Sequence, residues 1–290
     1  MIYRQHTLNC RGRLLTIGQP IVMGILNVTP DSFYDGGALP TTDAAVERAG
    51  IMLDEGATIL DIGACSTRPG AGETSEQEEL ERLLPVLQAV IRAFPEALIS
   101  VDTYRAAIAD AALAEGVHLI NDISGGVLDP AMIDIVASYG APFICMHMQG
   151  TPRTMQDNPQ YDDVAGTVLR YFVERLRVLR AAGMTDILID PGFGFGKTVD
   201  HNYSLLAKLG IFKFLEVPIV AGVSRKSMIC KVLGISPQRA LNGTTALHML
   251  ALERGASVLR VHDVREAMEV IALYRRYHVA LGRDAGPEVL

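Results

Sequence analysis

Short apolar runs recur along the chain with helix-period segments between them, and this alternation predicts the fold. Most of these runs are continuously apolar, as expected for parallel strands that are covered on both faces. The eight strand candidates are Ile21–Asn27, Ile59–Gly63, Leu98–Asp102, Leu119–Ile123, Phe143–Met148, Ile187–Asp190, Pro218–Val223 and Val258–His262. Residues 1–18 instead alternate loosely around Arg11-Gly12-Arg13, which predicts a small β-hairpin before the main fold.

The segments between the strand candidates carry helix signals. Ser75 and Glu78 match a capping box and predict an amphipathic helix that runs to about Phe94, and a second long helix is expected from Asp162 to Ala182. Several expected helices end at a glycine, and a strand candidate begins within a few residues: these are Gly56, Gly116, Gly140, Gly183 and Gly255. The helix-to-strand connections are therefore short, whereas the strand-to-helix connections are longer and rich in glycine, proline and polar residues.

Eight strand–helix units with one short-looped end predict an α/β fold, a (β/α)8 TIM barrel with an N-terminal β-hairpin. We assign residues 1–290 to a single domain, with the hairpin at 1–18 and the barrel at 20–282. The alternative is a doubly wound open sheet, which eight units and a hairpin would overfill. In a barrel of this kind the active site lies at the carboxyl ends of the strands.

Composition narrows the possible partners. The chain has 290 residues, 49% of them hydrophobic, and a formal net charge of −7, which argues against general affinity for nucleic acid or an anionic membrane. We find no signal-peptide core and no apolar run that approaches a membrane span. The four cysteines lack metal-ligand spacing and suit unpaired thiols, so we expect a cytoplasmic protein.

Polar residues stand at the predicted carboxyl ends of the strands and form two chemical sets. Any one of them could be an ordinary polar cap, but together at one end of a barrel they predict a site. Asp102, Asn121, Asp190 and Lys226 could satisfy the donor and acceptor edges of a flat heterocycle, with Met146, Phe195 and the face of Arg260 around the ring. Asn27, Arg68, Arg260 and His262 could hold a pyrophosphate.

The stretch Ile187–Lys197 connects one strand to its loop. Gly192, Gly194 and Gly196 alternate with other residues, which would allow the backbone to approach a flat or anionic ligand, although a plain glycine-rich turn is the alternative. The stretch matches neither a Walker loop nor the dinucleotide fingerprint. Lys226 could instead form a Schiff base, but its place at the start of a helix favours anion or carbonyl binding.

Eight motifs together resemble the dihydropteroate synthase family. They are Met23–Phe33, Ser66–Gly70, Ser100–Thr103, Ile120–Ile123, Met146–Gly150, Asp190–Lys197, Gly222–Ser227 and Arg260–Val264. The resemblance implies a transferase that joins p-aminobenzoate to 6-hydroxymethyl-7,8-dihydropterin pyrophosphate in folate biosynthesis, and that releases pyrophosphate. Since an arylamine is a modest nucleophile, we infer an SN1-like displacement in which the site stabilises the leaving group.

The resemblance also implies roles for individual residues. Catalytic roles fall to Asp102, Lys226, Arg260 and His262. Pterin contacts would come from Asp102, Asn121, Met146, Asp190, Phe195, Gly222, Lys226 and Arg260. Contacts with pyrophosphate and p-aminobenzoate would come from Asn27, Phe33, Thr67, Arg68, Pro69, Ser227, Arg260 and His262. Asn27 would bind Mg²⁺, the segments 28–37 and 67–72 would be mobile loops, sulfonamides would compete for the p-aminobenzoate pocket, and family members are commonly homodimers.

One position departs from the family pattern. Glutamate usually precedes Ser-Thr-Arg-Pro-Gly, and here that position is Cys65, which puts a loop-anchoring role for the glutamate in doubt. Two rival functions keep a pterin site: a methyltransferase that moves a methyl group from methyltetrahydrofolate to a corrinoid, and a pterin-binding protein without turnover. Neither accounts for Asn27, Arg68 and His262 together as an anion pocket.

Overall fold

The computed structural model describes residues 5–28, 42–65 and 74–282. The strands are β1 His6–Cys10, β2 Arg13–Ile17, β3 Ile21–Asn27, β4 Ile59–Gly63, β5 Leu98–Asp102, β6 Leu119–Asp122, β7 Phe143–Met146, β8 Ile187–Asp190, β9 Val220–Ala221 and β10 Val258–Val261. The helices are α1 Thr42–Asp54, α2 Glu76–Ala93, α3 Ala106–Ala114, α4 Met132–Tyr139, α5 Val164–Ala181, α6 Val199–Ala207, α7 Ser227–Leu233, α8 Leu241–Glu253 and α9 Val264–Ala280. Two short 3-10 helices, Leu209–Leu215 and Pro237–Arg239, follow α6 and α7.

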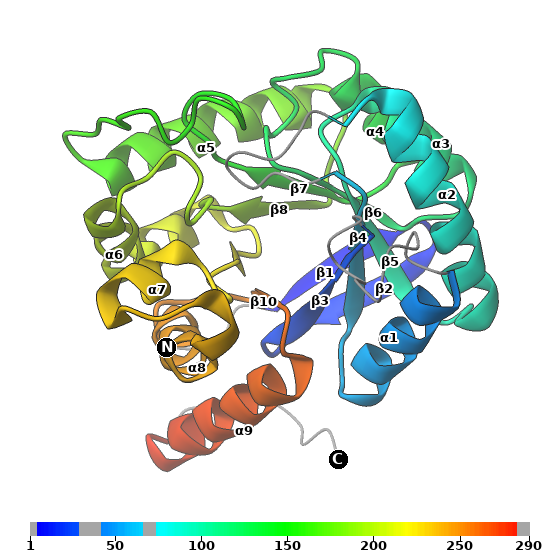
Figure 1. Ribbon diagram of the computed structural model, residues 1–290. Helices are drawn as coiled ribbons and strands as arrows, with labels where there is room; N and C mark the ends of the chain where they lie inside the picture. Colours follow the sequence, from blue (N-terminus) through cyan, green and yellow to red (C-terminus); the bar gives the residue numbers. More distant parts are fainter. Residues whose placement is uncertain (1–4, 29–41, 66–73, 283–290) are drawn as a thin grey trace.

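The eight strands from β3 to β10 form a parallel barrel surrounded by helices (Figure 1). Their order is β8-β7-β6-β5-β4-β3-β10-β9, and a parallel bridge between Ile189 and Ile219 joins β8 to the segment that leads into β9. The predicted (β/α)8 barrel is therefore confirmed, and the open doubly wound sheet is wrong. The N-terminal hairpin is also confirmed, as β1 and β2 pair antiparallel with Cys10 opposite Arg13.

Four strands are shorter than the sequence predicts, and polar turn formation explains the clearest case. After β6, the Asp122 carboxylate accepts hydrogen bonds from the amides of Ser124 and Gly126, both at 2.7 Å. The chain therefore turns at Asp122 instead of extending to Ile123. The others are β7, which ends at Met146, β9, which is limited to Val220–Ala221, and β10, which ends at Val261.

The helix boundaries follow the predicted signals. Ser75 and Glu78 form the capping box of α2, and the helix ends at Ala93 with Phe94 as its C-cap. The second long helix, α5, begins at Val164, two residues later than predicted. The glycines at the helix ends adopt positive φ angles, such as 102° at Gly56. This conformation lets the chain leave each helix and enter the next strand after a short connection.

The amino-terminal half of the barrel interior is apolar. Successive residues of a strand point to opposite faces, so every second residue points inward. Inward residues from seven strands form one buried cluster: Met23, Ile59, Leu119, Ile144, Leu188, Val220 and Val258. Leu8, Cys10, Leu15 and Ile17 of the hairpin belong to the same cluster. The hairpin therefore covers the amino end of the barrel with its own apolar face.

Candidate active site

The alternation of inward and outward residues that fills the amino half of the barrel interior with apolar side chains also brings polar side chains to its carboxyl half. Two residues beyond six of these inward apolar residues stand Asp61, Asn121, Met146, Asp190, Gly222 and Arg260, whereas β3 has Ile25 at that place. Asp102 ends β5 and Asn27 ends β3, four residues beyond Leu98 and Met23. Because parallel strands present all their carboxyl ends at one end of a barrel, the sequence-predicted residues from different strands meet on one rim.

Arg260 lies between two carboxylates on this rim. Its Nε donates to Asp61 Oδ2 at 2.6 Å, and its Nη2 donates to Asp102 Oδ2 at 2.6 Å. Asn121 Nδ2 donates to the same Asp61 oxygen at 3.0 Å. The carboxylates thus hold the edge of the guanidinium, and its planar faces are the surfaces on which a ring could stack.

Burial changes the acidity of Asp102. Removal from water disfavours the charged form and raises the pKa of Asp102 to about 7, and Asp61 and Asp122 add to the rise, while the Arg260 guanidinium opposes it. A proton can therefore be taken up or released here near neutral pH.

Asp190 ends β8, and Lys226 follows β9, the strand that pairs with β10, so the two lie on the side of the rim next to Arg260. Gly192 N donates to Asp190 Oδ1 at 2.7 Å, and a side chain on Gly222 would contact Asp190 Oδ2 and Lys226 Nζ. Burial raises the pKa of Asp190 and lowers that of Lys226 to about 8, while the opposite charge of each opposes the shift of the other. The missing side chain at Gly222 leaves both polar groups approachable.

Two of the residues predicted to surround a ring lie next to this pair. The Lys226 ammonium stands 4.8 Å from the centroid of the Phe195 ring and also donates to the Phe193 carbonyl. Met146 is buried, with 3% of its surface exposed. Met146 and Phe195 thus supply apolar surface next to donors and acceptors, which is what recognition of a flat heteroaromatic ring requires.

The glycine-rich loop after β8 lies against the loop after β7. A Cβ atom at Gly192 would lie 1.9 Å from the His147 carbonyl oxygen, and one at Gly196 would lie 2.6 Å from the Gln149 carbonyl oxygen. The close backbone approach predicted for a ligand is thus made to a neighbouring loop at these two positions. Only glycine fits them, because both also have positive φ.

A buried lysine holds this loop in shape. Lys197 Nζ contacts the Gly192 carbonyl at 2.9 Å, the Phe195 carbonyl at 3.0 Å and His147 Nδ1 at 3.0 Å. Burial lowers the pKa of Lys197 to about 7 and that of His147 to about 3. A neutral imidazole and two carbonyls therefore surround the amine and fix the loop that carries Phe195.

The predicted anion set is only partly within the described residues. His262 Nδ1 lies 3.0 Å from Ser224 Oγ, and Asn27 ends β3 close to Gly63. Ser227 is the first residue of α7. Arg225, which precedes Lys226 at the start of α7, donates to both oxygens of Asp263, at 2.8 and 2.7 Å, so its guanidinium ties two loops together. Phe33, Thr67, Arg68, Pro69 and both predicted mobile loops, apart from Val28, lie outside the described residues.

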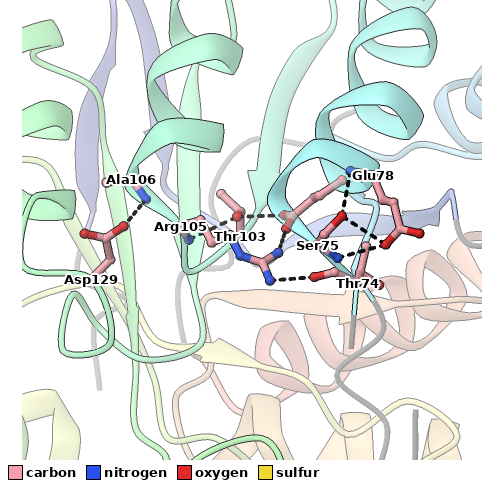
Figure 2. A network of polar contacts seen from close by, with 8 residues as sticks. Thr74, Ser75, Glu78, Thr103, Arg105, Ala106 and Asp129 are labelled. Carbon is pink, nitrogen blue, oxygen red and sulfur yellow. Dashed lines mark hydrogen bonds and ion pairs between the residues drawn. The ribbon is translucent and has the colours of Figure 1, made fainter. Parts of the chain in front are cut away.

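Cys65 stands beside a buried acidic residue from another element. Glu79 of α2 accepts a hydrogen bond from Thr103 Oγ1 at 2.9 Å and pairs with Arg105, which also donates to the Thr74 carbonyl at 2.6 Å. Figure 2 shows these contacts between the start of α2 and the loop after β5. Burial and Glu79 raise the pKa of the Cys65 thiol. The position that departs from the family pattern thus borders an intact carboxylate–arginine network.

Sequence reasoning missed Asp61, although a signal was present. A charged residue inside the apolar strand Ile59–Gly63 is costly to bury unless it has partners, and the alternation directs it inward. Its partners are two predicted ring-binding residues, so it belongs to the same site. Ser224, which orients His262, and Lys197 were missed as supporting residues for a different reason, since their partners come from other loops.

Comparison with known proteins identifies the class. Residues 23–262 match the family model described as pterin binding enzyme. The dihydropteroate synthase of Escherichia coli is 46% identical over 90% of this chain and 93% of its own length. A structure of the Yersinia pestis dihydropteroate synthase with a sulfonamide drug superposes with a TM-score of 0.89, at 44% identity, over 94% of this chain and 100% of that chain. One of the Xanthomonas albilineans enzyme with 7,8-dihydropteroate has a TM-score of 0.83, at 40% identity, over 94% and 99%.

The fold and the rim therefore define a barrel transferase of the pterin-binding class. Within that class, the chain belongs to the dihydropteroate synthase family. Its activity is the condensation of the dihydropterin pyrophosphate with p-aminobenzoate to give 7,8-dihydropteroate, and the corrinoid methyltransferase and the protein without turnover are set aside.

Proposed function

We propose that the rim residues divide this reaction between a ring half and a diphosphate half. The ring half consists of Asp102, Asn121, Asp190, Lys226 and Arg260, with Met146, Phe195 and Gly222 at the ring surfaces. The observation that carries the assignment is the pairing of buried carboxylates with buried cations at the carboxyl ends of the barrel strands. A pterin offers an amino-pyrimidine edge to the carboxylates and a ring carbonyl to the ammonium.

We infer that the ring half also promotes bond breaking. When the bond to pyrophosphate breaks first, positive charge develops on the exocyclic carbon and is delocalised into the dihydropterin. An ionised Asp102 at the rim favours that charge through space, and the arylamine, which is neutral at pH 7, then attacks. The displacement is thus SN1-like, and the amine needs little help from a base.

The diphosphate half must stabilise the leaving group. Arg260 of β10 and His262 after it, which Ser224 orients, supply positive or donating groups beside β3, the strand that Asn27 ends, and the resemblance adds Thr67 and Arg68. Among the described residues no group of three or more His, Cys, Asp or Glu side chains could hold a metal. Mg²⁺ keeps several waters and completes its shell with substrate phosphates, so it needs few protein oxygen ligands. Asn27 would hold Mg²⁺, which when bound would neutralise diphosphate charge.

Pyrophosphate release tests the division directly. Purified protein with the dihydropterin pyrophosphate and p-aminobenzoate should release pyrophosphate with Mg²⁺ present and lose most of its turnover in excess chelator. Asn27→Ala should raise the Mg²⁺ concentration needed for half-maximal rate, while ring affinity, measured by calorimetry with 6-hydroxymethyl-7,8-dihydropterin, stays unchanged. Full turnover in chelator would reject the metal assignment and leave the ring assignment standing.

The p-aminobenzoate pocket is assigned to Phe33, Pro69 and Ser227. The Yersinia pestis relative binds a sulfonamide drug, and a Xanthomonas albilineans structure holds 4-aminobenzoic acid. We infer that sulfonamides compete with p-aminobenzoate here. A sulfonamide that raises the KM for the diphosphate substrate instead would contradict the assignment.

We also infer a homodimer that works in the cytoplasm. Apolar side chains are exposed on neighbouring helices: Val232 and Leu233 on α7, Leu250 on α8, and Leu273 and Tyr277 on α9. The cysteines Cys10, Cys65, Cys145 and Cys230 are free thiols, which persist in a reducing compartment. No helix among the described residues is long and apolar enough to cross a bilayer. Sedimentation should give twice the chain mass, and Leu273→Glu should lower it; a monomeric parent would contradict the dimer.

A further inference from the structure

Asp61 occupies an unusual position for a carboxylate. It stands in the middle of β4, between two apolar residues, and none of its surface is exposed. In the sheet register it lies opposite Ile25 of β3 and Ser100 of β5. A buried charge of this kind persists only where partners compensate for the lost water. Because Asp61 is fully buried, it cannot itself be the group that reads a substrate edge.

The partners of Asp61 are two residues of the ring half. Oδ2 accepts from Arg260 Nε at 2.6 Å and from Asn121 Nδ2 at 3.0 Å. One atom therefore determines how the guanidinium of β10 and the amide of β6 lie relative to each other, across the barrel interior. An amide that donates one N–H to Asp61 presents its carbonyl oxygen and its other N–H in a defined direction.

The two oxygens of the Asp61 carboxylate are used unequally. Oδ1 is buried without a hydrogen-bond partner among the described residues, as is Ser100 Oγ on the neighbouring strand. An unpaired buried oxygen costs free energy that a purely structural carboxylate would not need to carry. The cost is offset at Oδ2, where one interaction with a cation and one with an amide converge.

Arg260 links this arrangement to Asp102. The guanidinium is shared, with Asp61 and Asp102 each 2.6 Å from it. If Asp61 were neutral, Arg260 would be held through Asp102 alone and could turn about that single contact. The face that Arg260 offers to a ring would then lose its fixed orientation.

We propose that Asp61 is the positioning residue of the ring half, which fixes Arg260 and Asn121 before the substrate binds by holding both through a single carboxylate oxygen. This assignment deepens the proposed function and rests on it, since it requires Arg260 and Asn121 to contact the pterin.

Asp61→Asn tests the assignment with little change in volume. The variant should fold but bind 6-hydroxymethyl-7,8-dihydropterin roughly 10- to 100-fold more weakly in calorimetry, because a charged acceptor for two donors is lost. The KM for p-aminobenzoate at saturating dihydropterin pyrophosphate should change by less than about threefold. Unchanged ring affinity, or equal losses for both substrates, would overturn the proposal.

Two control variants separate positioning from general stability. Ser100→Ala removes a buried neighbouring hydroxyl that hydrogen-bonds to neither Arg260 nor Asn121, and it should keep both ring affinity and turnover. Glu79→Gln neutralises another buried carboxylate that holds an arginine, Arg105, and should lower the melting temperature without weakening ring binding. A loss of ring affinity in Glu79→Gln as large as in Asp61→Asn would overturn the proposal.

A measurement on the unmodified chain keeps the proposal testable if Asp61→Asn does not fold. In NMR spectra of nitrogen-15-labelled protein without ligand, the Nε–H signal of Arg260 can be assigned by its loss in Arg260→Lys. The hydrogen of this group should already exchange slowly with water. Exchange as fast as that of an exposed arginine would show that the guanidinium is not held in advance. Wild-type protein that forms no dihydropteroate would instead reject the proposed function.

Discussion

The two ends of the barrel are built from the same strands, yet they have different tasks. At the amino end, β6, β7 and β8 send Leu119, Ile144 and Leu188 inward against the hairpin. Two residues later, the same strands send Asn121, Met146 and Asp190 to the rim. Apolar contacts at one end can therefore supply stability, while buried charges at the other end need partners that the substrate or the rim must provide. The difference predicts that stability and ring affinity respond to separate substitutions.

Leu188→Ala should have the largest effect, and on stability alone. Removing a fully buried side chain from the amino-end cluster should cost about 2–5 kcal/mol of the free energy of unfolding, which urea titration would measure. Leu188→Met, which keeps the volume, should cost less than about 1.5 kcal/mol. Affinity for 6-hydroxymethyl-7,8-dihydropterin should stay at the wild-type value in both. A large loss of affinity in the folded Leu188→Ala protein would break the division between the two ends.

Asp190→Asn should give the converse result at the other end of β8. The loss of a charge-assisted pair should weaken binding of the same ligand by about 1–3 kcal/mol in calorimetry. The matched control is Asp186→Asn. Asp186 directly precedes the amino end of the same strand, and its carboxylate accepts a hydrogen bond from the Asn9 backbone N–H. That control should leave ligand affinity unchanged, and equal affinities for the two variants would contradict the role of Asp190.

The smallest effect concerns pH. Asp102 is ionised only above its pKa of about 7, and Lys226 is charged only below its pKa of about 8. If both charged forms are needed, kcat/KM for the dihydropterin pyrophosphate should peak between these values and fall by up to about tenfold per pH unit outside them. Rates should be measured from about pH 5.5 to about pH 9.5. Asp102→Asn should remove the acid limb, and an unaltered acid limb in that variant would assign it to another group.

The barrel and most of its rim were predictable because they follow from local patterns. Apolar runs of the right length, glycines at helix ends and polar residues at strand ends each leave a signal in the sequence, so Asp102, Asn121 and Asp190 could be predicted at one end. The alternation that turns every second residue inward also marks Asp61, but a single charge within an apolar strand does not reveal its partners.

Contacts between distant loops were not predictable. Nothing near Lys197 in the sequence indicates that His147 lies beside it, and nothing near Arg225 indicates that Asp263 takes both of its donors. The glycines at 192 and 196 suggested a ligand, whereas their near neighbours are carbonyls of the loop after β7. Such roles depend on how separate segments meet, which a one-dimensional pattern does not contain.

The hairpin that covers the amino end has a consequence for the order in which reactants arrive. Because Leu8, Leu15 and Ile17 close the amino end, substrates and products must enter and leave at the carboxyl end of the barrel. Asn121 and Asp190 are each only 4% exposed, whereas Asn27, His262 and Ser227 lie nearer the solvent. Since its ring contacts are the more deeply buried ones, the bicyclic substrate should bind before p-aminobenzoate, and steady-state kinetics should be sequential and ordered.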